Sequence, residues 1–215
     1  MKRKTASFTG TRPIFTGSPA IVMGGFNLDK DAQNFRVGDV IPAGTLAIRD
    51  EETRKVQVIK TAKVLEIDAD DKKKLTLYVD EFYAPCFAEG DYVVKAGAFS
   101  GAKKASTPTI TRVIENENTN LYQVVLSAEI PGLAKGDVIV EGVESSDDIV
   151  ERGQANSVTI KDVTVSEFET GIDVSADTMQ YALYERRVPP ITDSQKDETG
   201  SFLKVNPHVK LTKSH

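Results

Sequence analysis

The chain has 215 residues, of which 40% are hydrophobic and 27% charged, and its formal net charge at pH 7 is -5. A chain of this length can bury a substantial core, and the composition is that of a globular protein, so a disulfide-held mini-protein and a wholly disordered chain are excluded. The 23 Val, 14 Ile and 19 Thr residues far outnumber the 11 Leu, and β-branched side chains favour strands. The sequence therefore predicts an all-β protein of one or two small antiparallel sandwich or barrel units with an extended N-terminal arm.

The first residues, Met1-Lys2-Arg3-Lys4, resemble the basic start of a secretory signal. The longest apolar run behind them, Ala20 to Met23, is shorter than the roughly 7–15 residues of a signal's apolar region. No stretch approaches the roughly 18 apolar residues of a membrane span, and the single Cys86 can form no internal disulfide. We expect a soluble protein from a reducing compartment, with no membrane contact.

Residues 1–34 are interpreted as the arm. The first 28 residues carry four basic side chains and no acidic one, although the whole chain is acidic. Glycine and proline recur every few residues, which excludes a helix and interrupts any strand, yet apolar side chains are interspersed. Such a segment must pack on its own body or on a partner; the alternative is a first strand with a frayed terminus. The predicted contact residues are Lys2, Arg3, Lys4, Phe8, Arg12, Ile14, Phe15, Ile21, Val22, Met23 and Phe26.

Three hairpins are predicted in the body, each from two runs of alternating apolar residues around a polar turn. They lie at residues 46–58, 64–79 and 110–126. A further strand is predicted at residues 179–187, before Pro189-Pro190 ends regular structure. The predicted divisions of the body are a β unit at residues 35–104, a second at residues 105–190, and a C-terminal tail at residues 191–215.

A short motif occurs three times, at Gly38-Asp39, Gly90-Asp91 and Gly136-Asp137. In each copy an apolar residue precedes the turn, and an apolar run and a closing glycine follow it. The glycine can adopt a positive φ and the aspartate can cap the turn through its carboxylate. We interpret the three copies as structural corners rather than phosphate or metal sites, because none of them opens a helix.

Residues 141–177 carry ten acidic and two basic side chains, a net charge of -8. This concentration predicts one strongly acidic surface, with most of its carboxylates in solvent. An acidic body disfavours nucleic-acid binding, which only the basic arm could contribute.

Catalytic and metal chemistry is poorly supplied. His208 and His215 lie in the tail without neighbouring ligands, and no histidine lies in the body to activate Cys86, which is predicted to be a buried apolar residue. A pair of carboxylates for glycan hydrolysis stays open, because separation in space cannot be read from one sequence. We predict a chain that is not an enzyme and holds no cofactor or metal.

The segment Phe35-Arg36-Val37-Gly38-Asp39-Val40-Ile41-Pro42-Ala43-Gly44-Thr45 resembles the head fibre proteins of tailed bacteriophages, as do residues 60–64, 87–94 and 184–189. Ile41-Pro42-Ala43-Gly44-Thr45 also resembles a turn in phage capsid decoration proteins. The resemblance implies a virion structural protein, made in the host cytoplasm and attached to the outer surface of the capsid. It implies the major capsid protein as partner and a homo-oligomer, with a trimer favoured. The chain carries no long repetitive shaft, which favours head decoration over a fibre.

The composition of the arm agrees with this resemblance. Its basic side chains would contact acidic groups on the capsid surface, while the acidic body projects away from the capsid. Two other functions stay open. A receptor- or glycan-binding module would show exposed aromatic side chains, although the chain has no Trp and only six Tyr. A carboxylate-dependent glycan hydrolase would show two acids about 5–10 Å apart in a cleft.

Overall fold

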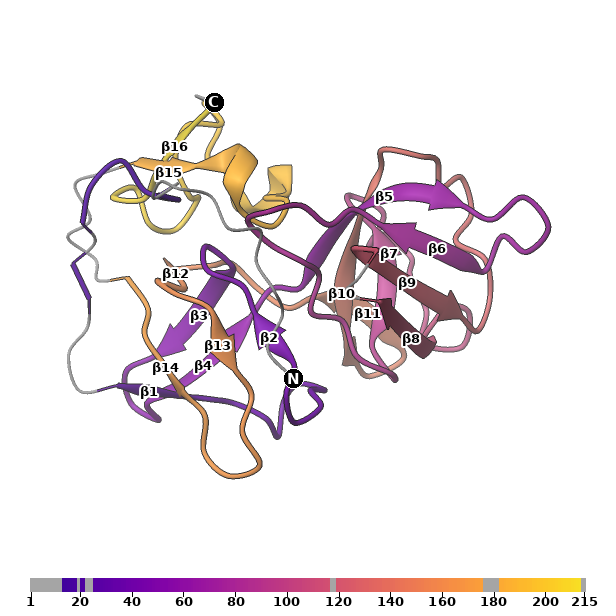
Figure 1. Cartoon of the computed structure of the whole chain (residues 1–215), viewed down its shortest axis with the longest axis horizontal. Helices are drawn as coiled ribbons and strands as arrows, with labels where there is room; N and C mark the ends of the chain where they lie inside the picture. Colours follow the sequence, from indigo (N-terminus) through magenta and orange to yellow (C-terminus); the bar gives the residue numbers. More distant parts are fainter. Residues whose placement is uncertain (1–12, 19, 22–24, 117–118, 176–181, 214–215) are drawn as a thin grey trace.

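The structure, a computed structural model, describes residues 13–18, 20–21, 25–116, 119–175 and 182–213. Strands dominate it, and the described residues add only two short 3-10 helices, η1 (Glu185–Arg187) and η2 (Asp193–Gln195). This confirms the predicted all-β class. Figure 1 shows two lobes side by side, with the C-terminal strands packed against the lobe that contains β1.

The N-terminal lobe contains a five-stranded sheet in the order β12-β3-β4-β1-β14 and a separate pair formed by β2 and β13. Side chains along β4 alternate between buried and outward positions, as expected for a strand with one face on a core. That core includes Phe26, Leu28 and Val56. The bounds are β1 (Phe26–Leu28), β2 (Val40–Ile41), β3 (Leu46–Asp50), β4 (Lys55–Val58), β12 (Ser157–Val158), β13 (Val163–Thr164) and β14 (Gly171–Ile172).

The barrel lobe contains seven strands in the order β11-β10-β5-β6-β9-β8, with β7 also paired to β10. Val93 N donates to Pro108 O at 3.0 Å and Ile110 N donates to Asp91 O at 2.9 Å. These bonds join the two ends of the sheet, so it curls around its own core. The bounds are β5 (Thr61–Ile67), β6 (Lys74–Leu77), β7 (Tyr92–Lys95), β8 (Ile110–Asn116), β9 (Leu121–Leu126), β10 (Val138–Ser145) and β11 (Asp148–Glu151).

The C-terminal unit is a parallel pair of strands, β15 (Ala182–Tyr184) and β16 (Lys210–Thr212). Its core cluster includes Leu46 of the N-terminal lobe and Val140 of the barrel lobe. The tail therefore packs on its own chain. The strand predicted at residues 179–187 is present as β15, which is followed by η1, and residues 179–181 lie outside the described part.

All three predicted hairpins are present, as β3–β4, β5–β6 and β8–β9. The predicted division at residue 104 falls inside the barrel sheet, where β6 pairs with β9 and β5 pairs with β10. The chain builds most of the N-terminal lobe, crosses to the barrel lobe, and returns to complete the first sheet with β12 and β14. The lobes therefore follow neither of the two predicted ranges.

The three Gly-Asp copies are corners of the same geometry. The φ values are 96° at Gly38, 91° at Gly90 and 93° at Gly136, the region where glycine is favoured. In each copy the aspartate carboxylate accepts from the backbone N–H three residues earlier, and the chain then enters β2, β7 or β10. The three donors are Arg36 N at 2.7 Å, Ala88 N at 2.8 Å and Ala134 N at 2.7 Å.

Candidate functional site

The predicted contact residues of the arm are described only in part. Those outside the described residues are Lys2, Arg3, Lys4, Phe8, Arg12, Val22 and Met23.

The apolar side chains of the described arm pack mainly on their own chain. Phe15 is buried in the core of the C-terminal unit, where it pairs with Leu183, and Ile14 packs against the same core. Phe26 is buried in β1. These positions correct the prediction that Phe15 and Phe26 contact a partner, because both side chains are already enclosed by their own lobes. Ile21, with 41% of its surface exposed, is the most accessible of the four.

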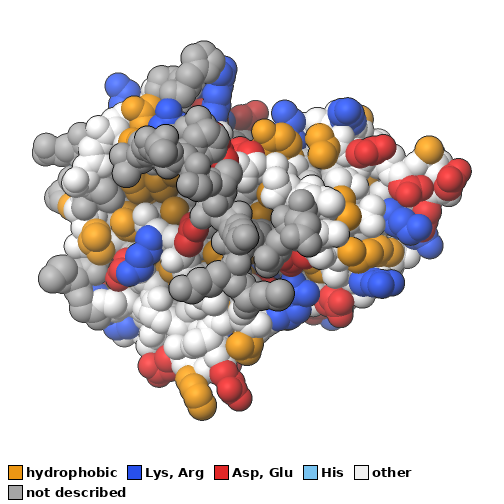
Figure 2. All heavy atoms as spheres, viewed as in Figure 1, with side chains coloured by type: hydrophobic (Ala, Val, Ile, Leu, Met, Phe, Trp, Pro, Cys, Tyr) orange, Lys and Arg blue, Asp and Glu red, His pale blue; other side chains and the backbone are white. Residues whose placement is uncertain are grey.

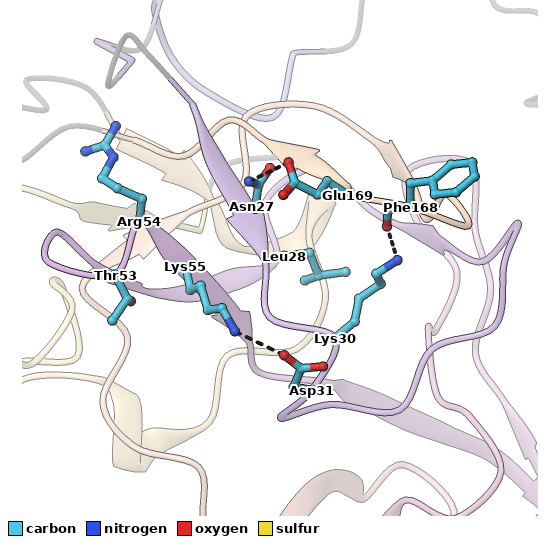
Figure 3. Close-up of a pocket in the computed structure, with 9 residues that line it drawn as sticks. All are labelled: Asn27, Leu28, Lys30, Asp31, Thr53, Arg54, Lys55, Phe168 and Glu169. Carbon is cyan, nitrogen blue, oxygen red and sulfur yellow. Dashed lines mark hydrogen bonds and ion pairs between the residues drawn. The ribbon is translucent and has the colours of Figure 1, made fainter.

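A surface pocket of about 330 Å³ opens on the N-terminal lobe. It lies between β1, the turn that follows β1, the β3–β4 hairpin and the loop between β13 and β14, and Figure 3 shows its walls. Its lining residues are Asn27, Leu28, Lys30, Asp31, Thr53, Arg54, Lys55, Phe168 and Glu169.

Several polar groups of the pocket already have partners within the chain. Lys55 donates to Asp29 at 3.0 Å and to Asp31 at 3.2 Å, and these bonds raise the pKa of Lys55. Asn27 Nδ2 donates to Glu169 at 3.2 Å. The pocket walls are thus cross-linked by hydrogen bonds and ion pairs among their own side chains.

One wall of the pocket is the loop of residues 166–169, which we call the display loop. Lys30 Nζ donates to the carbonyl oxygens of Ser166 at 3.0 Å and Glu167 at 3.1 Å, and also to that of Phe168. Ser166 Oγ donates to Glu169 O at 2.6 Å. The Phe168 ring is 80% exposed and points away from the other lining side chains (Figure 3). Hydrogen bonds from Lys30 and Ser166 thus fix the backbone of the loop, while the Phe168 ring is exposed to solvent.

Four charged side chains, Lys60, Asp91, Glu141 and Arg152, form a buried charge cluster between the lobes. Lys60 Nζ lies 2.7 Å from Asp91 Oδ2 and 3.8 Å from Glu141 Oε1. Arg152 donates to both oxygens of Glu141, at 2.9 and 3.2 Å. Glu141 is an exception within the acidic stretch of residues 141–177, because its carboxylate is buried with two cations.

The cluster lies where the chain crosses between the lobes, since Lys60 separates β4 from β5 and Arg152 follows β11. Gln33 Nε2 of the N-terminal lobe donates to Glu141 at 3.0 Å, and Asn34 Nδ2 donates to Asp91 at 3.2 Å. Burial outweighs the attraction of Lys60 and raises the pKa of Asp91 to about 6. Because these groups are buried and bonded to residues of both lobes, the cluster joins the two lobes.

Cys86 is buried, as predicted, and it lies near this cluster. Burial raises the pKa of its thiol to about 12. The thiol is therefore protonated at neutral pH, and it is not an accessible nucleophile.

Sequence reasoning missed both the charge cluster and the display loop. Lys60 interrupts an apolar run from Val58 to Ala62, which is a signal that its ammonium group needs a buried partner. Phe168 is an aromatic residue between two acids outside any strand pattern, which is a signal for exposure. Neither signal identifies which residues lie near Lys60 or Phe168 in the folded chain.

The described residues contain no group of three or more His, Cys, Asp or Glu side chains placed to hold a metal ion. None of their helices has the length and apolar character to cross a membrane.

Comparisons with protein-family models, with curated proteins and with solved structures found no match to this chain.

Proposed function

We propose that the chain is a non-enzymatic structural protein of a tailed-phage virion, a decoration protein held on the outer face of the major capsid shell by its basic N-terminal segment. The observation that carries this proposal is the charge distribution. Residues 1–12 contain four bases and no acid, although the chain as a whole has a net charge of -5. The remaining residues therefore carry -9, and a basic terminal segment on an acidic body suits a protein that attaches through that segment.

The packing of the described arm narrows the attachment segment. Phe15 and Phe26 are committed to cores of this chain, and Thr16 N donates to Ala182 O at 2.9 Å. Phe15, Thr16 and Phe26 thus have their contact surfaces within the chain. The bases available for a shell are then those before residue 13, namely Lys2, Arg3, Lys4 and Arg12.

The body has features that suit a rigid structural protein. One core cluster draws residues from both lobes and the C-terminal unit, and the charge cluster joins the lobes where the chain crosses. Lobes joined by a continuous core resist rotation against each other.

Cosedimentation of the full chain with empty shells of the phage that encodes it tests the proposal. The test variant replaces Lys2, Arg3, Lys4 and Arg12 with Ala. The matched control replaces four exposed lysines of the body with Ala, which changes the net charge equally: Lys72, Lys73, Lys135 and Lys204. We expect the test variant to bind at least about tenfold more weakly and the control to bind as the original chain does. Equal binding by both variants would contradict attachment through the N-terminal segment.

A receptor- or glycan-binding module is the second candidate, and the 80% exposed Phe168 ring favours it. Sugar rings stack on exposed aromatic faces. Because the ring points away from the pocket, the sugar would stack on the outer side of the display loop. Titration of the full chain with host-surface oligosaccharides, followed by the NMR signals of this loop, tests the idea. Shifts that Phe168→Ala removes support it, and unshifted signals reject it.

A further inference from the structure

Among the described residues, the two most exposed large hydrophobic side chains lie at one end of the N-terminal lobe. Phe168 is 80% exposed and Val37 is 68% exposed. Strands β2 and β13 are antiparallel, and Gly38 N donates to Val165 O at 2.9 Å, so the turn that bears Val37 lies beside the display loop. We call these two segments, residues 36–38 and 166–169, the apolar end. In Figure 2, hydrophobic and acidic side chains are seen together at the lower end of this lobe.

The apolar end is held in place without a partner. Lys30 fixes the display loop through three carbonyl oxygens, and the Asp39 carboxylate accepts from Arg36 N at 2.7 Å across the neighbouring turn. A preorganised loop loses little conformational entropy when it binds. An exposed aromatic residue on such a loop has the properties of an interface anchor.

The anchor is flanked by negative charge. Glu167 and Glu169 are both exposed, and neither forms an ion pair with another residue in the described part of the chain. The occupant of this end therefore needs an apolar surface with a basic neighbour.

The barrel lobe carries such a surface on the outer side of β5 and β6. Leu65 is 42% exposed and Tyr78 is 38% exposed. Tyr78 N donates to Lys63 O at 2.8 Å, which places the exposed Lys63 next to this apolar pair. We call these three residues the receiving face.

We propose that the apolar end of one copy docks on the receiving face of a second copy of this chain. The two surfaces differ and lie on different lobes (Figure 1), so one copy meets the next through unlike surfaces. Two copies can make this contact reciprocally, or several copies can close it head-to-tail into a ring. The proposal gives the expected homo-oligomer a specific interface, and it does not depend on attachment to a shell.

Sedimentation velocity of the purified full chain over a range of concentrations tests this self-association. We expect a species of at least twice the 23.4 kDa chain mass. Phe168→Ser should raise the concentration needed for assembly at least about tenfold. The matched control is Val205→Ser, which removes another exposed apolar side chain (51%) from the C-terminal unit and should leave assembly unchanged.

A charge exchange tests the pairing of the two surfaces. Glu167→Lys and Lys63→Glu should each weaken assembly about tenfold, and the double variant should restore it to within about threefold, because the opposite charges meet again. A chain that stays monomeric at about 100 μM, or an assembly indifferent to Phe168→Ser, would overturn the proposal. Binding to shells is scored separately by cosedimentation, so failure of self-association and failure of attachment are distinguishable.

Discussion

Two of the Gly-Asp corners have the same backbone conformation but differ in the surroundings of their aspartate side chains. At Gly90-Asp91 and Gly136-Asp137 the glycine φ values are 91° and 93°, and both aspartates accept from the backbone N–H three residues earlier. Asp91 is buried against Lys60, whereas Asp137 is partly exposed and 2.8 Å from Lys95.

The environments give the two carboxylates opposite behaviour. Burial raises the pKa of Asp91, while the hydrogen bonds from Lys95 and Ala134 N lower the pKa of Asp137. The local sequence therefore sets the turn, and the residues that pack around it decide whether its carboxylate joins two lobes or remains in solvent.

The largest expected difference between the corners comes from removing their cations. Lys60→Met leaves Asp91 buried without its nearest positive charge and should reduce the free energy of unfolding at pH 7 by about 3–5 kcal/mol. Lys95→Met breaks an exposed pair and should cost less than about 1 kcal/mol. Urea unfolding of the two variants measures the contrast. Equal losses would show that the buried cluster does not join the lobes as described.

The pH dependence of stability should also differ in sign between the corners. Because the folded pKa of Asp91 is about 6, the folded chain holds a proton that the unfolded chain has released between about pH 4 and pH 6. The contribution of Asp91 to stability therefore falls as pH rises through this window. The contribution of Asp137, whose pKa is lowered, is present above about pH 4 and is lost as pH falls.

Replacing each aspartate with Asn separates these contributions. Asp91→Asn should flatten the stability profile between about pH 4 and pH 6 by about 1–3 kcal/mol. Asp137→Asn should change the profile only at lower pH. Thermal unfolding at a series of pH values measures both, and a flattened profile between pH 4 and pH 6 in the Asp137 variant instead would reverse the assignment.

Glycine substitution tests the part that the corners share. Gly90→Ala and Gly136→Ala each place a side chain at a positive φ and should each cost about 1–2 kcal/mol. A Cβ at position 90 would also lie 3.3 Å from Asn34 Nδ2, whereas position 136 is open, so Gly90→Ala should be the more costly. A negligible cost at both positions, measured by urea unfolding, would mean that glycine is not required there.

A small effect is also expected at the display loop, where a third lysine, Lys30, donates to carbonyl groups rather than to carboxylates. Lys30→Met should cost about 1 kcal/mol of stability, because the bonds lie near the surface. It should also speed hydrogen exchange of the amides in residues 166–170 while leaving β9 protected. Unchanged exchange in the loop would show that Lys30 does not hold it.

Much of the fold could be predicted because its causes are local. Alternating apolar residues and polar turns predict the β3–β4, β5–β6 and β8–β9 hairpins, since both strands and their connection lie within one short segment. The Gly-Asp corners could be predicted for the same reason, because donor and acceptor are three residues apart.

The rest depends on contacts between distant segments. The pairing of β12 with β3 joins Ser157 to Ala47, and no local pattern indicates that the chain returns to its first sheet. The charge cluster combines Lys60 with Asp91 and Glu141. In the sequence, each of the three lies in a different local pattern: the start of a strand, a turn and an acidic segment. In the arm, apolar content predicts burial correctly for Phe15 and Phe26 but does not indicate which surface covers them.

The most direct measurement of the central claim is a cryo-EM reconstruction of empty shells incubated with the full chain. We predict ordered two-lobed density outside the shell, connected to the major capsid protein through the segment before residue 13, with the acidic body facing outward. Bare shells after incubation, or density attached through the body with that segment pointing away from the shell, would contradict it.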